Sequence, residues 1–229
     1  MLDAKGVEYR RLDLFPAASQ LWLRLLGYRR GTVPALRIGS IRVQGTREIA
    51  RALDARWPDP PLFPADPHER AQIEELEEWA DDHLQVQARR IILSALSRSP
   101  AGVRAALEGS ALPLPIPAAL AVPAAVPLLW LDRRIHGVTD AAAEDALRRL
   151  PETLDRLDAA IERGDLGRRP STAADFQVAA SVRMLLTLDD LQALLANRPV
   201  TQLARQLIPR FTGRVPAGAL PTAPLLHGR

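Results

Sequence analysis

Two kinds of hydrophobic pattern follow each other along the chain, and the change falls near residue 60. Apolar and polar residues alternate within 7–14, and two further short runs, 35–39 and 41–44, have the composition of strands. The Gly39-Ser40 step between these two runs predicts a hairpin with a tight turn. From residue 68 onward, apolar positions recur every three or four residues, which predicts helices.

The same periodicity gives the expected helices and the domain organisation. Helices are predicted at 17–27, from Thr46 to about 57, and at 68–97, 140–163, 172–187, 188–197 and about 200–211. In the first of these, Leu21, Trp22 and Leu25 stand at helical spacing. The proline-rich stretch PDPPLFPADP predicts a rigid linker. We therefore expect a small domain at 1–57, a linker at 58–67 and an all-helical domain at 68–229.

The composition is that of a globular protein, and the distribution of charge argues against a nucleic-acid-binding protein. Apolar residues make up 47% of the 229 positions and charged residues 25%, as in globular proteins. The net charge is +3, Lys5 is the single lysine, and the arginines are scattered among acidic residues. A nucleic-acid-binding protein would concentrate them on one face or tail, so no nucleic-acid partner is predicted. Without cysteine or an apolar leader sequence, a cytoplasmic location is expected.

Two segments allow a structural and a functional reading. The acidic run EELEEWADD at 74–82 is typical of the solvated face of a helix, and metal binding is the alternative. The four histidines form no constellation, and no metal site is predicted. Residues 111–131 carry no charge and are long enough to span a bilayer, but five prolines interrupt them. A buried irregular segment or the wall of an apolar pocket is favoured over membrane insertion.

Three local motifs have a physical interpretation of their own. Pro34 precedes a predicted strand, where it cannot donate to the ladder. Thr46 stands at the start of a predicted helix, whose first amides and dipole favour a carboxylate ligand, although a simple N-cap is the alternative. Thr172 and Asp175 match the capping-box pattern and predict the start of a buried helix.

Five stretches in order give the chain a family resemblance. They are GVEYRRLDL, VPAL, VQGTREIARALD, WPDPPLFPADP and STAADFQVA, and they are spread over residues 6–179 of the sequence. This order resembles the glutathione transferase superfamily. The resemblance implies an α/β plus all-α fold: a thioredoxin-like N-terminal domain that lacks its first strand here, followed by the all-helical C-terminal domain of the family.

The resemblance also implies a ligand site. The Val33–Pro34 peptide would be cis, and the backbone of Val33 would pair with glutathione as an added antiparallel strand. Gly45 and Thr46 would bind the γ-glutamyl carboxylate, with Gly45 standing where the family usually has an acidic residue. Gln44 is the nearest polar substitute for it. Thr172 and Asp175 would be structural, and Asp175 is not treated as catalytic.

No catalytic residue is assigned. The family's thiolate-stabilising Tyr, Ser or Cys precedes the part of the fold that this chain resembles, and Tyr9 and Ser19 fall in other elements. Translation from an upstream start, or a degenerate relative of the family, is expected. The implied function is conjugation of glutathione, as co-substrate, to an apolar electrophile by a homodimer. A non-catalytic binding or scaffold protein is the alternative, and a membrane-associated protein is a third.

Overall fold

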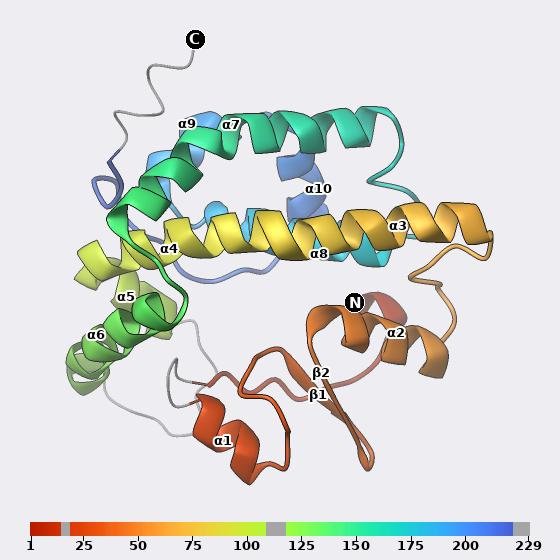
Figure 1. Cartoon of the computed structure of the whole chain (residues 1–229), viewed down its shortest axis with the longest axis horizontal. Coiled ribbons are helices and arrows are strands. Elements are labelled where there is room, and N and C mark those ends of the chain that lie inside the picture. Colours follow the sequence, from red (N-terminus) through yellow and green to blue (C-terminus); the bar gives the residue numbers. More distant parts are fainter. Residues whose placement is uncertain (15–18, 109–117, 222–229) are drawn as a thin grey trace.

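The described part of the molecule is mostly helical, with one small sheet. The computed structural model describes residues 1–14, 19–108 and 118–221, without the side chains of 118–121. Figure 1 shows one long helix crossing the molecule, with α7 (Asp140–Glu162) along one side and the N-terminal elements along the other. The two-stranded antiparallel sheet belongs to the N-terminal elements. This arrangement agrees with an α/β part followed by an all-α part, while the domain boundaries stay predictions.

The N-terminal elements confirm the predicted hairpin and the helix after it. They are the 3-10 turn η1 (Asp3–Lys5), α1 (Ser19–Leu25), β1 (Ala35–Ile38), β2 (Ile41–Gln44) and α2 (Thr46–Arg56). In the hairpin, Ala35 lies opposite Gln44 and Ile38 opposite Ile41. Gly39 occupies the turn with a φ of 59°, a conformation that glycine adopts without steric cost. The hairpin therefore fixes residues 34 and 45 as neighbours at its open end.

One expectation for the N-terminal part is wrong, and one is confirmed without showing which residues pack. Residues 7–14 form no strand, because within the described chain the sheet contains only β1 and β2 and offers this segment no ladder. In α1, Leu21, Trp22 and Leu25 are exposed by 63%, 40% and 71%, and Leu23 is the buried residue. The helix exists as predicted, and it packs against the rest of the molecule through Leu23.

The helical part follows the predicted periodicity closely. Its elements are α3 (Pro67–Trp79), the π-helical segment η2 (Ala80–Gln85), α4 (Val86–Arg98), α5 (Pro100–Glu108), α6 (Ala118–Ile135), α7, α8 (Ala173–Leu185), η3 (Asp189–Leu191), α9 (Gln192–Leu195) and α10 (Pro199–Leu207). α3, η2 and α4 run on without a break and form the long helix expected at 68–97. α8 packs against α3, η2, α4 and α10, so it lies at the centre of this part. Burial of these apolar faces is the main stabilising contribution.

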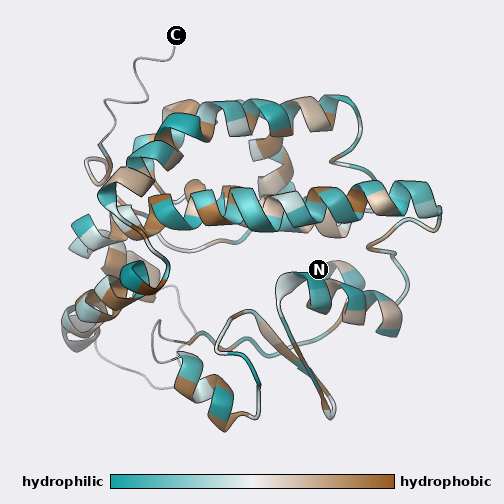
Figure 2. Ribbon diagram, in the orientation of Figure 1, coloured by the Kyte–Doolittle hydropathy of each residue, from teal (hydrophilic) through white to brown (hydrophobic). Residues whose placement is uncertain are grey.

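The uncharged segment is helical where the structure describes it. Residues 118–131 of that segment belong to α6, which contains Pro123 and Pro127, whereas 111–117 lie outside the described residues. Trp130 and Ile135 are more than half exposed, and Figure 2 shows apolar residues along much of this helix. Among the described residues, no helix has the length and apolar character needed to cross a membrane.

The linker at residues 58–67, called the connector below, packs against both the N-terminal elements and the helical part. The carbonyl of Leu62 accepts a hydrogen bond of 2.9 Å from the amide of Ala173, at the start of α8. The guanidinium groups of Arg51 and Arg70 both lie against the Phe63 ring, with their Cζ atoms at 5.0 and 4.9 Å from its centroid. Such cation–π contacts stabilise by roughly 0.5–1 kcal/mol each where they are exposed. The connector is thus packed rather than loose.

The acidic run does not form a uniformly solvated face, which corrects the sequence interpretation. Glu77 is fully buried between α3 and α2, and its Oε2 lies 2.9 Å from Nη1 of Arg51. Its Oε1 has no hydrogen-bond partner within residues 1–14, 19–108 and 118–221. Burial raises the pKa of Glu77 above its ordinary value, and the hydrogen bond from Arg51 opposes this shift only in part.

We expect Glu77→Gln to change how stability depends on pH. Because its native pKa is raised, the folded protein holds the Glu77 proton more tightly than the unfolded chain does. This contribution is fully present below the ordinary glutamate pKa and is lost as pH rises through the raised value. The free energy of unfolding of Glu77→Gln, relative to the wild type, should therefore increase from pH 4 to pH 7 in urea titrations. Glu75→Gln makes the same chemical change at an exposed position of α3 and should show a smaller trend; equal trends would contradict the prediction.

Candidate functional site

The hairpin and α2 bring the two predicted halves of the site together. β1 and β2 end side by side, and the amide of Gly45 donates a hydrogen bond of 3.0 Å to the carbonyl of Pro34. The Val33–Pro34 peptide is cis, as the sequence analysis expects. Val33 and Pro34 therefore lie directly beside the first turn of α2.

Val33 presents a free stretch of backbone. Its amide and carbonyl form no hydrogen bond with any residue that the structure describes, since the ladder begins at Ala35 opposite Gln44. The residue is 60% exposed. An extended peptide could pair with these two groups as a strand pairs with a sheet edge.

The N-terminus of α2 provides amides for an anion. Gly45 is the N-cap, with a φ of 95°, and no side chain caps the helix. The first helical bond runs from Ile49 to the carbonyl of Gly45, so the amides of residues 46–48 have no partner in the described chain. Thr46 is the first helical residue, not the N-cap, and its hydroxyl forms no hydrogen bond with a described residue. These donors and the helix dipole favour a negatively charged group.

An acidic side chain lies beside Gly45, although position 45 itself carries no side chain. Gly45 has no side chain, but the carboxylate of Glu48 lies so close that a Cβ at position 45 would collide with its Oε2. Glu48 also pairs with Arg30 through a 3.3 Å contact between Oε1 and Nη1. Both partners are largely exposed, so this pair contributes little to stability. The structure thus supplies a carboxylate from one turn later in the helix.

Gln44 has a structural task, which corrects the view of it as a substitute for the acidic residue. Its side-chain oxygen accepts from the amide of Arg30 at 2.8 Å, and its nitrogen donates to the carbonyl of Arg30 at 2.6 Å. The same nitrogen lies 3.2 Å from the carbonyl of Thr32. The side chain of Gln44 therefore fixes the loop that leads into Val33.

A shallow cleft of about 420 Å³ adjoins this site. It is lined by Gly27, Tyr28, Arg29, Arg30, Arg42, Val43, Gln44 and Glu48. Arg42 is held there by a 2.8 Å hydrogen bond from its Nε to the carbonyl of Leu26. Val33, Pro34, Gly45 and Thr46 do not line the cleft. A ligand that contacts both the cleft and these four residues would lie across the rim formed by Gln44 and Glu48. The surface there carries three arginines and one carboxylate.

The remaining predicted residues have a structural role. Thr172 caps α8, and Asp175 completes the capping box as the sequence predicts. Among the described residues, no group of three or more potential ligands could hold a metal ion. Tyr9 is exposed, and its hydroxyl lies 3.4 Å from Asp3. Neither Tyr9 nor Ser19 lines the cleft.

Sequence reasoning missed Glu48, Arg30 and Tyr28 as members of the site region. Glu48 carried a signal, because an acidic residue at the third helical position commonly folds back toward the N-cap. Arg30 and Tyr28 lie in a loop without periodicity, and only the tertiary contact with Gln44 places them.

No family model, no curated protein and no solved structure matches this chain.

Proposed function

We propose that this protein binds glutathione, or a closely similar thiol peptide, through Val33 and the N-terminus of α2. The observation that carries the proposal is the 3.0 Å hydrogen bond between Gly45 and Pro34, which places a free peptide edge beside free helix amides. One feature suits a peptide backbone and the other suits a carboxylate. A small anionic peptide has both groups. The resemblance to the glutathione transferase superfamily supports the same ligand.

Each part of such a ligand has a partner in the site. The amide and carbonyl of Val33 would pair with the backbone of the central cysteine residue. The hydroxyl and amide of Thr46, with the next helix amides, would bind the γ-glutamyl carboxylate. Glu48 would bind the neighbouring ammonium, a role for which Gly45 has no side chain. The arginines of the adjoining cleft add positive charge that favours an anionic peptide.

The reaction that fits this ligand is conjugation to an apolar electrophile. The thiol of glutathione loses its proton, and the thiolate sulfur forms a bond to an electrophilic carbon while the leaving group departs with its electron pair. A hydrogen-bond donor to the sulfur would lower the thiol pKa and so raise the fraction of nucleophile. We assign that donor to no described residue. A homodimeric transferase and a non-catalytic binding protein therefore share the proposed site and differ in this step.

We expect Thr46→Val to weaken glutathione binding by about ten-fold, the effect of one lost hydrogen bond to a charged group. The melting temperature should change little, because the Thr46 hydroxyl bonds to no described residue. Isothermal titration calorimetry with glutathione measures the first quantity and thermal unfolding the second. Thr46→Ser keeps the hydroxyl and should retain binding.

Three results would count against the proposal. The first is that the wild-type protein does not bind glutathione at concentrations up to about 10 mM. The second is that Thr46→Val and the wild type bind glutathione with equal affinity. The third is that Thr46→Val loses affinity only in proportion to a loss of folded protein. Product formation from glutathione and an aryl halide, measured separately, distinguishes the transferase from the binding protein.

A further inference from the structure

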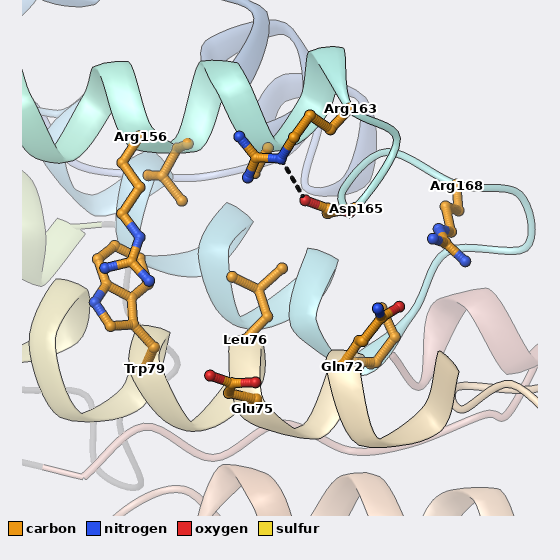
Figure 3. Close-up of a pocket in the computed structure, with 11 residues that line it drawn as sticks. Gln72, Glu75, Leu76, Trp79, Arg156, Arg163, Asp165 and Arg168 are labelled. Carbon is orange, nitrogen blue, oxygen red and sulfur yellow. Dashed lines mark hydrogen bonds and ion pairs between the residues drawn. The ribbon is translucent and has the colours of Figure 1, made fainter. Parts of the chain in front are cut away.

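A second cavity lies in the helical part, away from the site described above. It occupies about 270 Å³ between α3, the C-terminal half of α7 and the loop that follows α7. Its lining residues are Gln72, Ile73, Glu75, Leu76, Trp79, Arg156, Leu157, Ala160, Arg163, Asp165 and Arg168. Figure 3 shows Arg156 extending from α7 toward Trp79 of α3, and Arg163 at the end of α7 with its guanidinium beside Asp165.

The floor of this cavity is rigid and apolar. Ile73, Leu157 and Ala160 are exposed by 2%, 0% and 3%, so each is fixed by the packing of α3 against α7 and their neighbours. A binding site on such elements is held more precisely than one on loops alone. The polar and charged groups then stand around the rim of a preformed hollow.

Arg156 is positioned by an aromatic ring and lacks a negatively charged partner. Its Cζ lies 4.0 Å from the centroid of the Trp79 ring, and the ring of His83 stacks with Trp79 at 6.0 Å. Within the described part of the chain, no carboxylate or carbonyl bonds to its guanidinium. Stacking fixes the plane of a guanidinium while its N–H groups remain free along the edge. These free donors are suited to an oxyanion.

Arg163 adds a second set of donors on the same side of α7. It follows Arg156 by seven residues, about two helical turns, so both side chains share one face of the helix. Its Nε bonds to Asp165 at 2.9 Å, which leaves its terminal nitrogens without a partner among the residues described. Arg168 stands at the far end of the cavity, with its Nη1 at 3.6 Å from Glu69.

The structure points to a phosphate-binding site, and we propose that this cavity binds a small phosphate monoester that also carries hydroxyl groups. The free edges of Arg156 and Arg163 hold the phosphate, because the planar fork of a guanidinium matches two phosphate oxygens. Glu75 accepts hydrogen bonds from the hydroxyl groups of the ligand, and Gln72 can both accept from them and donate to them. Three arginines and two carboxylates leave one positive charge on the lining, which suits one phosphate better than a polyphosphate.

The test compares a hexose 6-phosphate, inorganic phosphate and the unphosphorylated hexose by isothermal titration calorimetry on the full chain. We expect the monoester to bind, the hexose to show no binding, and inorganic phosphate to bind at least about ten-fold more weakly than the monoester. Affinity should fall as sodium chloride is added, since the contacts are between charges near the surface.

Variants assign the binding to the cavity. Arg156→Gln and Arg163→Gln should each weaken monoester binding by about ten-fold or more. Arg149→Gln is the matched control, because Arg149 lies on α7, pairs with Asp145 and does not line the cavity; it should leave the affinity unchanged. Thermal unfolding confirms that each variant is folded. The proposal is overturned by a monoester that does not bind below about 10 mM, by inorganic phosphate of equal affinity, or by an equal loss in Arg149→Gln.

Discussion

Replacing Asp175 with alanine is expected to lower the free energy of unfolding by about 3 kcal/mol. Asp175 is fully buried at the start of α8. Its Oδ1 accepts from the amide of Gly167 at 2.7 Å, and its Oδ2 accepts from the amide and hydroxyl of Thr172 at 2.7 and 2.9 Å. Alanine would leave the buried amide and hydroxyl of Thr172 and the amide of Gly167 without this acceptor, and would free the loop after α7 from α8.

The burial of a carboxylate limits the size of this loss. Desolvation raises the pKa of Asp175, while the hydrogen bonds from Gly167 and Thr172 oppose that shift. Removing the carboxylate therefore also removes a cost of burial, which is why the expected loss is smaller than the sum of the broken bonds. Asp175→Asn keeps one acceptor oxygen and should lose less than alanine.

Urea titrations measure the effect, with Asp145→Ala as the control. Asp145 lies on the surface of α7, where it pairs with Arg148 and Arg149, and its removal should cost less than about 0.5 kcal/mol. A loss below about 1 kcal/mol for Asp175→Ala would show that the capping box does not hold the loop and α8 together.

The capping box shows which parts of this fold could be predicted from the sequence. Thr172 and Asp175 are three residues apart, so one helical turn determines their contact. The hairpin turn at Gly39 and the faces of α7 and α8 likewise depend on near neighbours in the chain. Such features follow from local periodicity and turn chemistry.

Features that need distant partners were predicted poorly. Alternation at 7–14 is a property of a strand, but a strand also needs a neighbour, and the described sheet provides none. Apolar spacing predicts the helix α1 but not its buried face, since Leu23 is buried while Leu21 is exposed. Glu77 belongs to an acidic run in sequence, and only the approach of Arg51 from α2 makes its burial acceptable.

The candidate peptide site falls between these cases. Val33, Pro34, Gly45 and Thr46 were placed by a resemblance, and the hairpin between them does bring Pro34 and Gly45 into hydrogen-bond contact. The carboxylate of Glu48 over Gly45 was not predicted, because it depends on how a side chain folds back at the helix start. Arg156 and Trp79 were not paired either, since they are 77 positions apart and on different helices.

The single lysine is a further residue whose importance only the tertiary structure reveals. The Nζ of Lys5 is fully buried and donates to Oδ1 of Asp54 at 3.1 Å and to the carbonyls of Trp57 and Pro60. Oδ1 of Asp54 also accepts from the amide of Leu62 at 2.7 Å. One ammonium group therefore joins the η1 turn, the end of α2 and the connector.

We expect Lys5→Met to lower the free energy of unfolding by about 2–3 kcal/mol, as measured by urea titration. Methionine has a similar length and keeps the packing of the stem, so the loss comes from the charge and the three donated hydrogen bonds. Asp54 would remain a partly buried carboxylate whose one remaining partner is the Leu62 amide. Arg10→Met, at an exposed position, is the control and should change stability by less than about 0.5 kcal/mol.

A double-mutant cycle with Asp54→Asn separates the ion pair from the two carbonyl contacts. Asparagine retains an oxygen for the Leu62 amide, so this variant chiefly removes the negative charge. If the ion pair provides much of the effect, the loss on Lys5→Met should be at least about 1 kcal/mol smaller in the Asp54→Asn background. Equal losses in both backgrounds would assign the stabilisation to the carbonyls of Trp57 and Pro60 alone. A loss for Lys5→Met no larger than that of Arg10→Met would show that the buried ammonium does not join these three elements energetically.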